Sequence, residues 1–114
     1  MPFININIAK QLSAEKKDAL QQAVTAAITL IPTKLPEQTT VCVRDGCAMY
    51  KNGAPLDGGL AEVRLFKSSP ADAKRAYTQK LFSIFDEIAG IPKSGLTVNV
   101  FEFDQWGSGG TLNE

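Results

Sequence analysis

The sequence predicts an α/β fold (α+β by some conventions) in which a duplicated βαβ unit forms a four-stranded mixed sheet with two helices on one face. Two observations carry this prediction. Segments with strand-like alternation and segments with helix-like apolar spacing follow in the order strand, helix, strand, and the order then repeats. Landmarks also recur at a near-constant offset, because Ser13 and Ser69 are 56 residues apart and Thr40–Val43 and Thr97–Val100 are 57 apart.

The first repeat spans about residues 2–44. Residues 3–8 read FININI, a strict alternation that predicts a half-buried strand. Ser13 is the expected N-cap of the helix that follows. The apolar stripe of that helix consists of Leu20, Val24, Ala27, Ile28 and Ile31. Two prolines then end the helix, and the β-branched segment TTVCVR over 39–44 predicts a second strand.

The second repeat spans about residues 60–103. It opens with LAEVRLFK over 60–67, which predicts a strand. Ser69 is the expected N-cap of the next helix, with Pro70 at its first position. The stripe of that helix consists of Tyr77, Leu81, Ile84, Phe85 and Ile88. Gly90 is the natural end of the helix, and LTVNVFEF predicts the last strand.

The remaining segments connect or extend the two repeats. A linker over 45–59 carries three Xaa-Gly turn signals, and residues 48–51 before Asn52-Gly53 predict one arm of a small hairpin. A Gly-rich tail occupies 104–114. A chain of 114 residues is the size of one domain, so we expect a single domain over 1–114.

The composition excludes several classes of function. Twelve Lys and Arg residues balance twelve Asp and Glu residues, which argues against nucleic acid as a partner. No apolar stretch approaches the roughly 20 residues that span a bilayer, so we expect no membrane association. The N-terminus lacks the basic segment and apolar core of a signal peptide, and the expected location is the cytoplasm.

The chain contains no histidine, which removes Ser-His-Asp and Cys-His nucleophile arrangements and histidine-based zinc sites. The two cysteines, Cys42 and Cys47, have neither C-x-x-C nor zinc spacing, and we expect two reduced thiols. The sequence therefore predicts no metal site and no cofactor. Any catalytic base must come from a carboxylate, a lysine, a tyrosine or the chain terminus.

Strand parity divides the predicted sheet into two faces. One face is aliphatic, as expected beneath two helices. The other carries small polar groups together with four of the six phenylalanines, namely Phe3, Phe66, Phe101 and Phe103. An exposed apolar face of this kind is typical of an interface, so we expect other copies of the chain to cover it. The alternative is that the tail or the hairpin folds over this face within one chain.

A duplicated βαβ chain that begins Met1-Pro2 and runs straight into a strand resembles the tautomerase superfamily. That superfamily includes 4-oxalocrotonate tautomerase, 5-carboxymethyl-2-hydroxymuconate isomerase and macrophage migration inhibitory factor (MIF). The specific marks are Pro2, Lys34, Asn99 and Trp106-Gly107 before the Gly-rich tail. Residues 49–53 and 61–64 look closer to an uncharacterised bacterial branch. The resemblance implies the MIF-like fold and a homotrimer.

The resemblance also implies a catalytic role for Pro2. In that superfamily the initiator methionine is removed and the proline nitrogen becomes a general base. A free terminal amine titrates near about 7.7–8.0, so a small downward shift suits it to neutral pH. The implied activity is a cofactor-independent tautomerase or isomerase of a small keto-enol acid. Alternatives are a Pro-dependent hydratase, dehalogenase or decarboxylase, and a non-catalytic homo-oligomeric binding protein of the same fold.

A substrate of this kind carries a carboxylate, which cations recognise. Lys34 corresponds to a pocket lysine of the MIF branch, and Arg44 and Arg64 lie on the polar face of the predicted sheet. An arginine clamps a carboxylate through two parallel hydrogen bonds. The alternative for both arginines is an interior ion pair with Glu62. Asn99 either orients a carboxylate or carbonyl or makes a hydrogen bond at an interface between copies.

Overall fold

A mixed four-stranded sheet is the frame of the molecule. The computed structural model describes residues 1–114, and its main sheet has the order β2-β1-β5-β6. The strands are β1 (Phe3–Ile8), β2 (Thr40–Arg44), β5 (Gly59–Phe66) and β6 (Leu96–Phe103). β1 and β2 are parallel, β5 and β6 are parallel, and β1 runs antiparallel to β5 in the centre. The predicted duplication and mixed sheet are confirmed.

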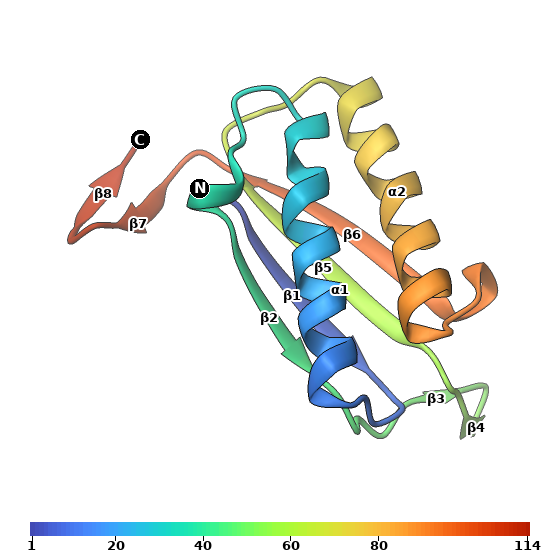
Figure 1. Cartoon of the computed structure of the whole chain (residues 1–114). Helices are drawn as coiled ribbons and strands as arrows, with labels where there is room; N and C mark the ends of the chain where they lie inside the picture. Colours follow the sequence, from blue (N-terminus) through green and yellow to red (C-terminus); the bar gives the residue numbers. More distant parts are fainter.

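Two helices cover one face of this sheet (Figure 1). α1 (Ala14–Ala26) continues as the 3-10 helix η1 (Ala27–Leu30), and α2 is Ala71–Ala89. The Ser13 side chain accepts a hydrogen bond from the Lys16 amide, which confirms the predicted N-cap of α1. Gly90 ends α2 in the left-handed conformation at φ 67°, where a glycine avoids the cost of a Cβ.

The core lies between the helices and the sheet. Alternate residues of β1 and β5 point into it, and Ile4, Ile6, Ile8, Val63 and Leu65 are fully buried. The helices contribute the predicted apolar stripes, among them Leu20, Val24, Leu81 and Phe85. Tyr77 joins the helices directly, because its buried hydroxyl donates a 3.0 Å hydrogen bond to the Val24 carbonyl. Burial raises the pKa of the Tyr77 phenol, so this donor keeps its proton.

Short elements extend the two ends of the sheet. They are η2 (Pro36–Gln38), β3 (Tyr50–Lys51), β4 (Ala54–Pro55), η3 (Lys93–Gly95), β7 (Trp106–Ser108) and β8 (Thr111–Asn113). β3 and β4 form the predicted hairpin, whose turn residues Asn52 and Gly53 both have positive φ. β7 and β8 form a second hairpin that projects beyond the end of the main sheet (Figure 1). No helix is long and apolar enough to cross a membrane.

The predicted cap of the second helix is wrong. α2 begins at Ala71 after Pro70, whose backbone is extended, and no side chain caps it. The helix begins one residue later than the sequence predicts, so Pro70 is at the N-cap instead of the first helical position and Ser69 lies outside the helix. The Ser69 backbone N–H donates a 2.6 Å hydrogen bond to the Glu102 carboxylate, which ties this segment to β6.

The phenylalanine-bearing face of the sheet is open in the single chain. Phe3, Phe101 and Phe103 are 37–39% exposed. The tail forms the β7–β8 hairpin at the end of the sheet and does not fold over this face (Figure 1). The alternative of a face covered by its own chain is wrong, and the face remains available to other copies.

Candidate functional site

The start of β1 is held in a fixed position. Pro2 is buried, and its carbonyl oxygen accepts a 3.0 Å hydrogen bond from the Thr40 amide at the start of β2. Met1 precedes it, so the nitrogen of Pro2 is a tertiary amide here and has no basic lone pair. Burial and, second, the Lys34 ammonium lower the pKa of the Met1 terminal amine below its usual value.

Lys34 is the one buried charged side chain, with 8% exposure. Its Nζ donates a 2.8 Å hydrogen bond to the carbonyl oxygen of Phe66 at the end of β5. Burial lowers the pKa of Lys34, and the charge of Glu102 opposes this shift. The Lys34 ammonium is near enough to the terminal amine for its charge to lower the pKa of that amine, so both groups lie at this end of the sheet. The structure therefore brings together the sequence-predicted Pro2 and Lys34.

Glu102 lies on the helix-covered face, where its charge raises the pKa of Lys34 against the effect of burial. This residue was not predicted from the sequence. One carboxylate oxygen accepts from Lys74 Nζ at 2.8 Å, and the other accepts from the Ser69 amide. These hydrogen bonds lower the pKa of Glu102, with Lys74 contributing most. A signal for it was present, because Glu102 interrupts the aliphatic alternation of Val98 and Val100 along β6.

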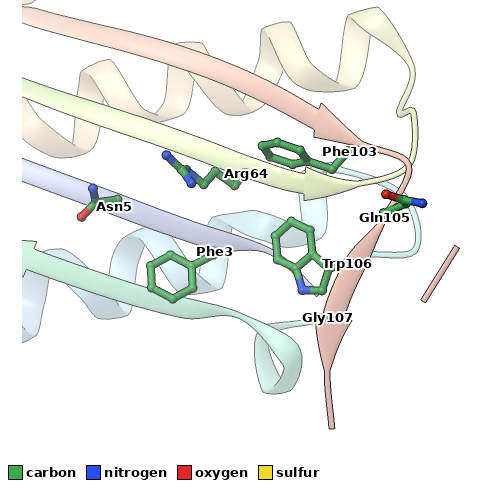
Figure 2. Close-up of a pocket in the computed structure, with 7 residues that line it drawn as sticks. All are labelled: Phe3, Asn5, Arg64, Phe103, Gln105, Trp106 and Gly107. Carbon is green, nitrogen blue, oxygen red and sulfur yellow. The ribbon is translucent and has the colours of Figure 1, made fainter. Parts of the chain in front are cut away.

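A cavity of about 420 Å³ lies at the same end of the sheet, on its open face. Its lining residues are Phe3, Asn5, Arg64, Phe103, Gln105, Trp106 and Gly107 (Figure 2). Three aromatic rings and three polar side chains therefore line one hollow. Phe3 follows Pro2 directly, and the β7–β8 hairpin reaches both places, since Trp106 lines the cavity and Ser108 contacts Met1.

Arg64 is the cation of this cavity and is loosely held. Its side chain is 45% exposed and lies 3.8 Å from the Glu62 carboxylate, with no hydrogen bond between them. The guanidinium lies 5.5 Å from the centroid of the Phe101 ring, in cation–π range. Glu62 instead accepts a 3.0 Å hydrogen bond from the Asn5 amide. The guanidinium donors of Arg64 therefore stay free for a ligand.

The other two predicted site residues lie apart from this group. Arg44 is opposite Asn7, four residues along β2 from Thr40, which is roughly 13 Å from the cavity end of the strand. Asn99 is exposed on β6 opposite Glu62 and lines no part of the cavity. Within a single chain, Pro2, Lys34 and Arg64 come to one end of the sheet, whereas Arg44 and Asn99 do not.

The side chains at this end of the sheet offer a limited set of chemical groups. No group of three or more Cys, Asp or Glu side chains is placed to hold a metal ion. Cys42 and Cys47 are both free thiols. The groups available at this end of the sheet are the chain terminus, two cations, two side-chain amides and three aromatic rings, which suit the binding of a small organic acid.

The fold of the chain is the tautomerase/MIF fold. Leishmania major MIF2 has a TM-score of 0.87 at 16% identity, over 98% of this chain and 97% of that one. Pt0534 inactivated by 2-oxo-3-pentynoate has a TM-score of 0.85 at 21% identity, over 95% and 93%. Native fused 4-OT has a TM-score of 0.84 at 18% identity, over 96% and 94%. These likenesses confirm the fold that the resemblance implied.

Comparison of sequences alone finds nothing of this kind: no family model matches the chain, and no curated protein matches it. The likeness to these solved structures therefore lies in the fold and not in overall sequence identity.

Proposed function

We propose that this chain, once it begins at Pro2, is a cofactor-independent tautomerase or isomerase of a small keto-enol acid. The Pro2 nitrogen acts as general base: it takes a proton from a carbon next to a carbonyl and returns it to the enolate oxygen or a conjugated carbon. The observation that carries the proposal is the placement of the terminus, the buried Lys34 and the cavity lined by Phe3 and Arg64 at one end of the sheet. Burial and the neighbouring Lys34 ammonium lower the pKa of the Met1 terminal amine there, and we expect the same surroundings to lower the pKa of a free Pro2 nitrogen.

The neighbouring cations have complementary roles. Lys34 holds the substrate carboxylate or stabilises the negative charge that develops on the enolate. Arg64 binds a carboxylate from the cavity side, since its guanidinium makes no hydrogen bond within the chain. The pyrrolidine ring of Pro2 keeps the base rigid at the start of a strand, so little conformational entropy is lost when substrate binds.

The active form is a homotrimer in this proposal. The open face of the sheet carries exposed Phe3, Phe101 and Phe103, which a second copy would bury. Solved structures with this fold include a symmetric trimer of fused 4-OT, with a TM-score of 0.87. In an assembly of this kind, Arg44 and Asn99 of one copy contribute to the site of a neighbouring copy.

The decisive experiment compares chains that begin at Pro2 with chains that retain Met1, each confirmed by intact mass. Ketonisation of an aryl enol-pyruvate is followed across pH, with Pro92→Ala as a matched proline substitution at the far end of α2. We expect activity only in the Pro2-terminal form and partial activity in Pro2→Ala. Full activity in the Met1-retaining form would overturn the assignment. A folded but inactive Pro2-terminal form would favour the non-catalytic binding protein.

A covalent probe tests the same nitrogen independently. Pt0534 was solved inactivated by 2-oxo-3-pentynoate. A nucleophilic secondary amine adds to the triple bond of this acid, forming a carbon–nitrogen bond while a proton goes to the neighbouring carbon. We expect an adduct on Pro2 in the Pro2-terminal form and none in the Met1-retaining form, by peptide mass mapping.

A further inference from the structure

The β7–β8 hairpin places a hydroxyl directly against the residue that the proposed function removes. Ser108 Oγ lies 2.6 Å from the sulfur of Met1, although the two residues are 107 positions apart. Ser108 is the last residue of β7 and is half-buried. The Met1 side chain therefore occupies the position in front of this hydroxyl.

Asn113 fixes the direction of that hydroxyl. Its side-chain amide donates to the Trp106 carbonyl at 3.1 Å and to Ser108 Oγ at 3.3 Å. Trp106 and Asn113 are paired across the hairpin, so both hydrogen bonds are short-range and reinforce the turn. Because Ser108 Oγ accepts from Asn113, its own proton is free to be donated away from the hairpin, toward Met1.

A thioether is a weak acceptor, and the departure of Met1 would leave the Ser108 hydroxyl without a partner. The same departure would also vacate the space beside Pro2, at the end of the sheet where Phe3 and Trp106 line the cavity. A half-buried donor aimed at a newly opened space is suited to an oxygen acceptor on a ligand.

We propose that Ser108 is a substrate-binding residue whose hydroxyl donates to a carboxylate or carbonyl oxygen of the substrate, in the position that Met1 occupies before its removal. This inference rests on the proposed function. It assigns to the hairpin a role in recognition, with Asn113 as the positioning residue for the hydroxyl.

The test measures binding and turnover separately. trans-Cinnamate, an aryl carboxylate that cannot tautomerise, is titrated by calorimetry into Pro2-terminal protein, and KM and kcat are measured with an aryl enol-pyruvate. We expect Ser108→Ala to weaken cinnamate binding and raise KM by roughly three- to tenfold, the size of one hydrogen bond. Ser108→Thr keeps the hydroxyl and should restore binding. Thr111→Val, which removes an exposed hydroxyl of the same hairpin, should bind as the wild type does.

The chain that retains Met1 provides a control, because a purely structural role of Ser108 would affect binding in that form as well. In a chain that retains Met1, the Met1 side chain already contacts the Ser108 hydroxyl, so Ser108→Ala should leave cinnamate binding unchanged. Equal binding by wild type and Ser108→Ala in the Pro2-terminal form would overturn the inference while leaving catalysis by Pro2 intact. If Ser108→Ala weakens cinnamate binding but the Pro2-terminal wild type shows no turnover, the proposed function is overturned and the inference is kept. A Pro2-terminal wild type that neither binds cinnamate nor turns over the enol-pyruvate would overturn both.

Discussion

Lys34 and Phe66 are joined by a 2.8 Å hydrogen bond from the lysine ammonium to the backbone carbonyl, across 32 positions of sequence. Thr33 and Lys67, the residues next to this pair, are both in the left-handed region, with φ of 70° and 66°. A β-branched residue rarely adopts such a conformation, and strain of this kind gathers at functional sites. The unusual backbone conformations of Thr33 and Lys67 thus flank the hydrogen bond that holds the buried Lys34 ammonium in place.

Replacing Lys34 tests whether this ammonium binds substrate. In Lys34→Met, which keeps most of the side-chain volume, we expect the Pro2-terminal protein to bind an aryl carboxylate about 1.5–3 kcal/mol more weakly, roughly ten- to hundredfold. The free energy of unfolding should change by no more than about 1 kcal/mol, because the loss of one hydrogen bond is offset by removal of a desolvated charge. Calorimetric titration and urea unfolding measure the two quantities. Lys16→Met, on the exposed side of α1, is the matched control; equal affinity in both variants would remove Lys34 from the site.

Glu102 should control the charge of Lys34. Because the Glu102 carboxylate raises the pKa of Lys34 against the effect of burial, Glu102→Gln should lower that pKa further. Carboxylate binding should then weaken at a lower pH than in the wild type, as read from the pH dependence of inhibition by cinnamate. Glu62→Gln, a carboxylate on the opposite face, should leave this pH dependence unshifted. An unshifted profile in Glu102→Gln would contradict the prediction.

The stability of the protein in acid should also depend on Glu102. Its pKa is lowered in the folded chain, chiefly by Lys74, so the carboxylate contributes stability above the ordinary pKa of glutamate. That contribution is lost as pH falls through the lowered value. We therefore expect the difference in Tm between wild type and Glu102→Gln to shrink from about pH 6 to about pH 3, as measured by thermal melts. A constant difference across this range would show that the charge of Glu102 does not stabilise the fold.

Arg64→Ala distinguishes a ligand-binding cation from a structural one. Its side chain is 45% exposed and lies 3.8 Å from Glu62, so the ion pair should contribute less than about 0.5 kcal/mol to stability. If Arg64 holds a carboxylate, affinity should fall by about 1.5–3 kcal/mol with little change in Tm. A thermal melt beside a binding titration separates the outcomes. A large loss of Tm with unchanged affinity would identify Arg64 as the structural partner of Glu62.

The open face of the sheet should be the assembly interface. Phe101→Asp places a charge on that face, and we expect it to convert the proposed trimer to a monomer that stays folded by circular dichroism. Leu30→Asp, which alters an apolar residue of comparable exposure in the helix layer, should have the same mass as the wild type. Light scattering at micromolar concentration reads the mass of each. A monomeric wild type under these conditions would refute the assembly.

Much of the fold could be predicted because its signals are local. The alternation in β1 and the apolar spacing of α1 each act within a few residues, and the Ser13 cap spans three. Ser69 carries an equally good local signal but lies outside the helix, because Pro70 with its extended backbone takes the N-cap position. The Ser69 amide is bound by Glu102, 33 positions away, a contact that no local pattern indicates.

The sequence by itself determined the repeated βαβ order, the aliphatic and phenylalanine-bearing faces of the sheet, and the absence of histidine, which leaves the terminus as a candidate base. Only the tertiary structure decided which groups meet there. It brought Lys34 to Phe66 and the terminus, and it placed Ser108 against Met1, whereas Arg44 lies at the far end of its strand. The physical reason is that strand register and the crossing of distant segments set these distances, and neither leaves a mark in local composition or spacing.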